Sequence, residues 1–163
     1  MSMLRYQNLL IGHGLLILVV ALLAGFMLGF GLVGGLETAP GSGEFMRVPF
    51  YYGSSEGWAR AHTGGITNGL MLLALALVMP HLFGDQIPLR RVFPYGLIFI
   101  GWANTVFYWL GNAAGNRALS FGDNRFGAAD AAGVLAMGLA SIAALLSLGL
   151  LAWGAWRVLW VRD

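Results

Sequence analysis

Three polar side chains lie inside otherwise apolar stretches of the chain, and their types could do chemistry. His62 lies near the start of an apolar run from Ala59 to Leu82, and Asn68 follows it six residues later. Tyr108 lies in another apolar run further along the chain. An imidazole can bind a metal, and an amide and a phenol can orient a small polar atom by hydrogen bonding. These residues therefore predict an enzyme site built around His62, Asn68 and Tyr108.

Small residues follow His62. Gly65 and Gly69 come three and seven residues after it and so share its face of a helix. A histidine beside a face without side chains would leave room for a haem, with the imidazole as axial ligand. The same glycines could instead form a helix-packing motif, with His62 hydrogen-bonded to a neighbouring backbone. The sequence leaves both interpretations open.

A polar stripe crosses the apolar run that contains Tyr108. Asn104, Tyr108 and Asn112 are four residues apart and line one face of a helix. Such side chains could hold helices together, or they could orient a substrate in a dry pocket. Asn68 lies about 9 Å beyond His62 and about 120° round the same helix. One pocket can use both His62 and Asn68 only if its ligand is broad or lies between subunits. This arrangement predicts an oligomer.

The composition predicts an integral membrane protein. Of 163 residues, 58% are hydrophobic and 10% are charged, whereas a soluble domain carries roughly 25% charged residues. Cysteine is absent, which excludes disulfides and thiolate ligands, and all nine basic residues are arginine, which excludes a Schiff-base lysine. The arginines are spread over several loops and form no basic patch, so nucleic-acid binding is not expected.

The order of apolar runs predicts an all-α fold, a four-helix transmembrane bundle in one domain covering 1–163. The expected spans are about 9–36, 59–82, 92–112 and 130–160, each near the roughly 20 residues that cross a bilayer. Asp130 would cap the fourth helix. One side of the membrane would hold five arginines and the other four, which places both termini in the cytoplasm by the positive-inside rule. The five are Arg5, Arg90, Arg91, Arg157 and Arg162, and the four are Arg47, Arg60, Arg117 and Arg125.

The other two histidines decide what kind of haem protein this chain could be. An electron-transfer b haem usually takes two axial ligands, and both would have to be histidine here. His13 and His62 would differ in depth by on the order of 15 Å, and His81 is expected at the membrane surface. A haem on His62 would thus keep an open face, which favours ligand binding or catalysis.

Several motifs, taken in order, resemble the styrene oxide isomerase family. They are Gly12-His13-Gly14 and Gly34-Gly35, the stretch 57–62 with Asn68-Gly69, the residues Gly101-Trp102, Asn104 and Phe107-Tyr108, and the loop 116–130. The similarity covers nearly the whole chain and is densest over 55–69 and 101–130. No single motif is specific, but their order and spacing together are.

The resemblance implies a trimeric enzyme of the bacterial inner membrane that binds ferric haem b between subunits, with His62 as axial ligand. It implies a Meinwald rearrangement, in which an aryl epoxide such as styrene oxide becomes an aldehyde such as phenylacetaldehyde. Tyr108 and Asn68 match the family's site positions and would orient the substrate. Arg60, Arg117 and Arg125 could pair with the haem propionates or be solvated loop residues. A soluble styrene monooxygenase is a possible partner.

Two departures from the family pattern bear on the preferred epoxide. Ile100 stands where the family can carry an acidic residue, and the 37–58 loop is longer, with Phe50, Tyr51 and Tyr52 added near the expected pocket mouth.

Two other functions remain open from the sequence. One is a membrane haem b protein without isomerase activity, a gas sensor or an electron carrier. The other is a membrane module in which the glycines and the polar stripe serve only packing.

Overall fold

The computed structural model describes residues 2–83, 92–114 and 131–160, which form four long helices and one short hairpin. The helices are α1 (Met3–Val33), α2 (Ser55–Phe83), α3 (Val92–Ala113) and α4 (Ala131–Trp160). Between α1 and α2, strand β1 (Leu36–Glu37) pairs antiparallel with strand β2 (Phe45–Met46). The expected all-α fold is confirmed, and the hairpin is a small addition that the apolar pattern did not predict.

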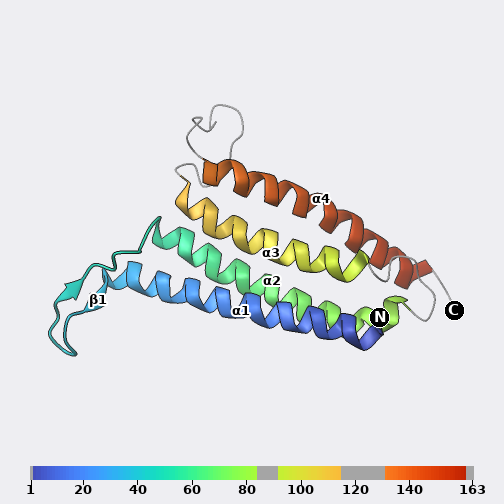
Figure 1. Cartoon of the computed structure of the whole chain (residues 1–163), viewed down its shortest axis with the longest axis horizontal. Coiled ribbons are helices and arrows are strands. Elements are labelled where there is room, and N and C mark those ends of the chain that lie inside the picture. The colour runs from blue at the N-terminus through green and yellow to red at the C-terminus, as the bar shows by residue number, and fades with distance from the viewer. Residues whose placement is uncertain (1, 84–91, 115–130, 161–163) are drawn as a thin grey trace.

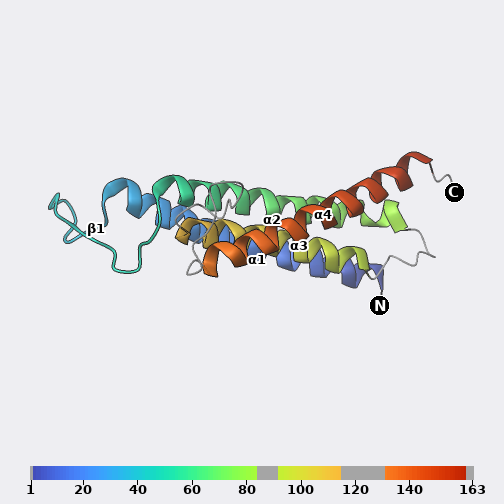
Figure 2. The ribbon, with the colours of Figure 1, turned by 90° about the horizontal axis from the view of Figure 1, so that it is seen from above.

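The helices run side by side as an up-and-down bundle (Figures 1 and 2). α1 packs mainly on α2, and α4 packs mainly on α3. α1 begins and α4 ends at the same end of the bundle, and the hairpin lies at the opposite end (Figure 1). Asp130, the predicted cap of the fourth helix, lies outside the described residues.

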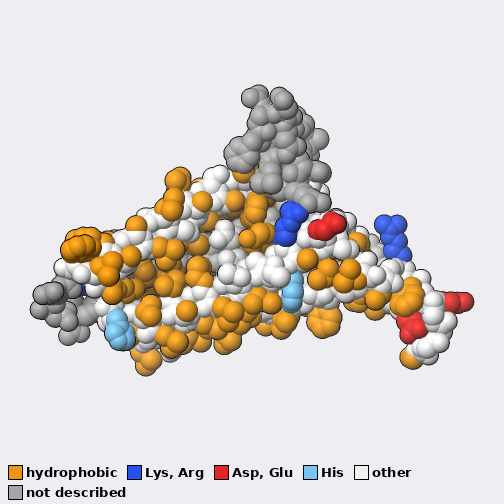
Figure 3. All heavy atoms as spheres, turned by 180° about the vertical axis from the view of Figure 1, so that it is seen from behind, with side chains coloured by type: hydrophobic (Ala, Val, Ile, Leu, Met, Phe, Trp, Pro, Cys, Tyr) orange, Lys and Arg blue, Asp and Glu red, His pale blue; other side chains and the backbone are white. Residues whose placement is uncertain are grey.

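Three of the described helices, α1, α2 and α4, are long and apolar enough to cross a membrane. Their outward side chains are largely hydrophobic, and on the face seen in Figure 3 the charged side chains gather toward the end that carries the hairpin. α3 has 22 residues, which span about 33 Å, but it carries the polar stripe. These features support a membrane protein, and the role of α3 as a fourth span stays a prediction.

Glycines bring α1 and α2 into near backbone contact. A Cβ added at Gly14 would lie 3.0 Å from the carbonyl oxygen of Gly69, and one added at Gly65 would lie 2.7 Å from Ala21 Cβ. This close approach is the small-residue packing typical of membrane helices. The face that His62 shares with Gly65 and Gly69 is therefore filled by α1. The idea that these two glycines leave room for a haem is wrong, and the packing interpretation holds for them.

An apolar core joins the first three helices away from the hairpin. Its largest buried members include Tyr6 and Ile17 of α1, Leu72 of α2, and Phe93 and Leu97 of α3. Ile100 belongs to the same cluster and is 2% exposed. An acidic residue at this position would lie among apolar side chains, so the isoleucine suits the packing here.

The hairpin closes on its own side chains. Glu37 accepts hydrogen bonds from the backbone N–H groups of Gly43 (2.8 Å) and Gly41 (3.0 Å), and these bonds lower the pKa of its carboxyl group. Gly41 and Gly43 have φ of 79° and 70°, in the left-handed region that favours glycine. The loop between the strands is thus folded without support from the helices.

Candidate active site

The imidazole of His62 is held by the backbone of α1. α2 begins at Ser55, so His62 lies about two turns into the helix. Its Nδ1 is 2.8 Å from the carbonyl oxygen of Ala21. A carbonyl can only accept, so Nδ1 carries the proton and donates it. In neutral His62 the lone pair then lies on Nε2, which has no hydrogen-bond partner among the described residues.

Gly25 makes this contact possible. A Cβ added at Gly25 would lie 2.8 Å from Nδ1 and 2.9 Å from Cε1 of His62. Real Cβ atoms essentially never approach other atoms so closely. The missing side chain at Gly25 therefore leaves the space in which the imidazole reaches the Ala21 carbonyl, one turn earlier on α1.

A groove of about 390 Å³ lies where α2 meets α3. Its lining residues are Arg60, Thr63, Gly64, Thr67, Asn68 and Tyr108. The structure thus brings Asn68 and Tyr108 together, as the sequence predicted, and adds the exposed Arg60 at the same groove. His62 does not line it, because its ring points to α1.

Only some of the polar groups at this groove are free to bind a ligand. Thr63 and Thr67 donate their hydroxyl protons to carbonyls of the preceding turn, at 2.9 Å to Ala59 and 3.0 Å to Thr63. The Tyr108 hydroxyl and the Asn68 Oδ1 have no hydrogen-bond partner within the described part of the chain. These two atoms can therefore contact a polar atom of a ligand.

The polar stripe of α3 serves two purposes. Tyr108 lines the groove, whereas Asn112 is buried beside the start of α2 and accepts a hydrogen bond from the backbone N–H of Ser54 at 3.0 Å. Asn104 is half-buried and does not line the groove. The helix-joining interpretation of the stripe thus holds for Asn112, and the ligand-binding one remains for Tyr108.

His13 joins α1 to α3. The indole Nε1 of Trp102 donates to His13 Nδ1 at 3.0 Å, and the two rings meet edge to face. His62 is level with Ala21, eight residues from His13, or about 12 Å along α1. This separation agrees with the expected difference in depth, so within one chain His13 and His62 cannot bind opposite faces of one haem.

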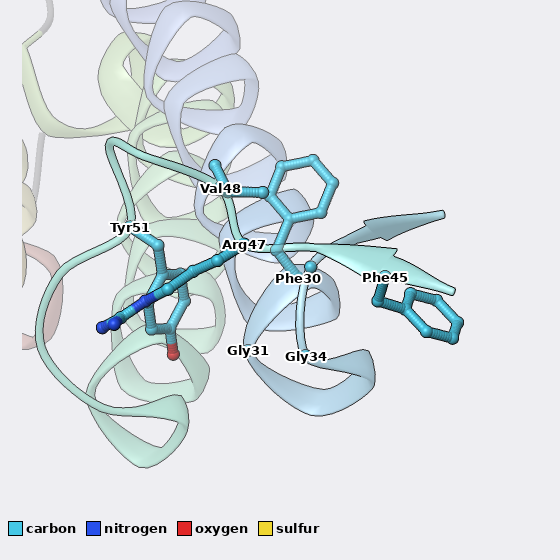
Figure 4. Close-up of a pocket in the computed structure, with 8 residues that line it drawn as sticks. Phe30, Gly31, Gly34, Phe45, Arg47, Val48 and Tyr51 are labelled. Carbon is cyan, nitrogen blue, oxygen red and sulfur yellow. The ribbon is translucent and has the colours of Figure 1, made fainter. Parts of the chain in front are cut away.

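The aromatic residues of the long loop do not line the groove. Tyr51 borders a separate cavity of about 270 Å³ at the end of α1 (Figure 4), together with Phe30, Gly31, Gly34, Gly35, Phe45, Arg47 and Val48. The carbonyl of Tyr52 accepts a hydrogen bond from the Trp58 indole at 2.8 Å. Phe50 is 63% exposed. Arg117 and Arg125, the other predicted propionate partners, lie outside the described residues.

Sequence reasoning missed three positions that shape the site. Gly25 admits the His62 ring, Gly64 admits the Tyr108 ring, and Thr105 holds Asn68 through a hydrogen bond of 3.2 Å. The glycines look like any other small residue in a membrane helix. Thr105 did carry a signal, since a hydroxyl next to Asn104 in an apolar run needs a partner.

A Gly64→Ala substitution tests the place of Tyr108 at the groove. The new Cβ would overlap the Tyr108 ring at Cε2, so the ring has to move. A displacement of about 1 Å can lower a rate about 100-fold, and we expect a loss of that order in turnover, measured in membranes. Gly138→Ala is the matched control, since its Cβ would meet nothing within 4 Å. Equal turnover in both variants would contradict the assignment.

The fold and the groove define a membrane protein of spanning helices with a polar site between two of them. Comparison with known sequences narrows this class. The profile of the styrene oxide isomerase family matches residues 6–159. The styrene-oxide isomerase of Pseudomonas fluorescens is 42% identical over 148 residues, which are 90% of this chain and 85% of that protein. The chain belongs to the styrene oxide isomerase family, and it is an isomerase.

Proposed function

We propose that this protein converts an aryl epoxide of the styrene oxide type into the corresponding aldehyde. The observation that carries the proposal is the 42% identity to a styrene-oxide isomerase over 90% of the chain. The groove of α2 and α3 supports it, because Asn68 and Tyr108 bring to its lining two uncharged polar groups with atoms that are unpaired within the described residues. The polar oxygen of an epoxide suits such a site.

The rearrangement requires no base and no nucleophile. The C–O bond at the benzylic carbon breaks and its electron pair goes to the oxygen. A hydride then moves from the neighbouring carbon to the benzylic carbon, and the carbonyl forms. Substrate and product have the same atoms, so no co-reactant is needed. Water must be kept out because it would trap the cation as a diol, and lipid or a second copy over the groove would exclude it.

Tyr108 and Asn68 would divide the work of orienting the epoxide. The free Tyr108 hydroxyl is a donor and would bind the oxygen, more strongly as negative charge develops there. Asn68 would fix the position of the rest of the epoxide from the facing helix. Both groups are neutral, so neither adds water or a counter-ion to the site.

His62 fits the axial ligand of a haem. A histidine that binds a metal usually donates its other ring N–H to a carbonyl or a carboxylate, as Nδ1 of His62 does to Ala21. Ferric haem b, when bound, would supply a Lewis-acidic iron that polarises the epoxide C–O bond. Arg60, Arg117 and Arg125 have the charge to pair with its propionates.

The position of His62 supports an oligomer, which we propose is a trimer. His62 turns toward α1, whereas the groove lies between α2 and α3. A site that uses both needs a broad ligand or a residue from a neighbouring copy. A second copy over the groove would also cover polar groups that are costly to expose to lipid. We place this trimer in the bacterial inner membrane with cytoplasmic termini, where a soluble styrene monooxygenase could supply the epoxide.

Styrene oxide with two deuterium atoms on the terminal carbon tests the reaction. Membranes containing the protein should yield phenylacetaldehyde with one deuterium on the benzylic carbon and one on the carbonyl carbon, measured by mass spectrometry at short times. Membranes without the protein are the control. A diol, or aldehyde that has lost the migrated deuterium, would argue against a hydride shift. If no aldehyde forms although the protein carries haem, a haem b gas sensor or electron carrier becomes the better proposal.

A further inference from the structure

A short chain of hydrogen bonds fixes the side chain of Asn68. Asn68 Nδ2 donates to Thr105 Oγ1 at 3.2 Å, and Thr105 Oγ1 donates to the carbonyl oxygen of Gly101 at 2.7 Å. Thr105 is 1% exposed and Asn68 is 7% exposed. The chain therefore runs from the backbone of α3, through a buried hydroxyl, to a side chain on α2 that borders the groove.

The proton count decides which way the Asn68 amide faces. A hydroxyl has one proton, and the Gly101 carbonyl can only accept, so the Thr105 proton goes to Gly101. Thr105 Oγ1 can then only accept from Asn68, so the NH₂ group must face it. The carbonyl Oδ1 of Asn68 is left without a hydrogen-bond partner among the described residues. The amide thus presents the negative end of its dipole to the groove.

We propose that Thr105 is a positioning residue that keeps Asn68 Oδ1 directed into the groove, where it stabilises positive charge on the substrate. This inference rests on the proposed function. When the benzylic C–O bond breaks, negative charge develops on the oxygen and positive charge on the benzylic carbon. The Tyr108 hydroxyl suits the oxygen and the Asn68 carbonyl suits the carbon. A fixed dipole directed at developing charge lowers a barrier because it needs no reorganisation. No proton moves, and Asn68 is unchanged at the end.

A Thr105→Val substitution removes the hydroxyl and keeps the shape of the side chain. Asn68 then loses the acceptor that holds its NH₂ group and can turn that group to the groove. We expect kcat to fall about five- to tenfold, the size of one lost hydrogen bond of this kind, with little change in KM. Thr105→Ser should restore kcat, because it returns the hydroxyl. Ser147→Ala in α4 is the control, since its hydroxyl also donates to a carbonyl of its own helix, at 2.7 Å.

The response to substituents on the substrate separates charge stabilisation from simple packing. With a series of para-substituted styrene oxides, kcat depends on how well the ring supports the benzylic cation. If Asn68 Oδ1 shares that task, Thr105→Val should make kcat depend more steeply on electron-donating substituents. In an Asn68→Ala background, Thr105→Val should have no further effect on kcat, because Thr105 acts through Asn68. The proposal would be overturned if the dependence of kcat on the substituent were unchanged in Thr105→Val. It would also be overturned if the losses in kcat from Asn68→Ala and Thr105→Val multiplied in the double variant.

The orientation of the amide can also be measured without turnover. In protein with ¹⁵N-labelled asparagine, the pair of Asn68 amide-proton resonances should be displaced from that of an unbonded asparagine amide, because Thr105 accepts from one of the two protons. Thr105→Val should shift this pair of resonances, and Thr105→Ser should leave it at its wild-type position. If the pair is the same in wild type and Thr105→Val, the positioning role is wrong, whatever the activity. If the pair responds but no epoxide is isomerised, the proposed function fails and the role in orienting Asn68 stands.

Discussion

A His62→Ala protein is expected to be purified without haem and to form no aldehyde from styrene oxide. His62 is the side chain whose Nε2 lone pair is left free by a hydrogen bond at Nδ1. His13 cannot take over, because its Nδ1 already accepts from Trp102 and it lies about 12 Å away along α1. The loss should appear as absence of the Soret band at unchanged protein yield, with turnover at the background of empty membranes.

Two controls separate loss of a ligand from loss of the fold. His81→Ala removes an exposed histidine at the end of α2 and should keep both the Soret band and turnover. Imidazole added to His62→Ala can occupy the space of the missing ring, and it should return part of the Soret band. Full haem content and full turnover in His62→Ala itself would contradict the ligand assignment and shift the haem to another residue.

A Gly25→Ala protein should keep His62 and still bind haem poorly. The added Cβ would lie 2.8 Å from His62 Nδ1. The helix backbone cannot move away easily, but the imidazole can, and in moving it loses the bond to the Ala21 carbonyl. Loss of such a supporting hydrogen bond typically weakens metal binding about 10- to 100-fold. We expect that loss in a haem titration of the apoprotein, with turnover falling in proportion to bound haem.

Gly29→Ala is the matched control for this experiment. Gly29 lies one turn after Gly25 on α1, and a Cβ there would meet nothing within 4 Å. The substitution carries the same gain in helix propensity without the contact to His62. If Gly25→Ala and Gly29→Ala bind haem equally well, the Ala21 carbonyl does not support the ligand. If both bind poorly, the effect belongs to α1 as a whole.

The elements could be predicted because membrane segments carry a simple signal. Long apolar runs bounded by charged loops predicted the helices, although α1 begins at Met3 rather than Leu9 and α2 at Ser55 rather than Ala59. These helix ends lie in polar sequence, where hydropathy gives no information. The pairing of Asn68 with Tyr108 at one groove could also be predicted, because each is a polar group that an apolar helix would not otherwise contain.

The surroundings of His62 could not be predicted in the same way. Spacing alone placed Gly65 and Gly69 on the face of His62, but it could not say whether a cofactor or another helix fills that face. The structure shows that another helix fills it, because α1 packs against both glycines. The partner of the imidazole is the backbone carbonyl of Ala21, and every residue has such a carbonyl. Only the fold selects this one.

The hairpin between α1 and α2 makes this connection a place where the length of the chain can vary. Its turn is closed by hydrogen bonds from the backbone N–H groups of Gly41 and Gly43 to the Glu37 carboxylate. The Thr38 N–H also donates to the Glu44 carbonyl at 2.8 Å. Residues inserted in the loop between the two strands lengthen that loop without displacing either helix. Such insertions cost little free energy of folding. Relatives can therefore differ here while the register of Gly65 and Gly69 against α1 stays the same. A short peptide tag placed at Ser42 should leave the protein folded and mark the end of the bundle opposite the termini.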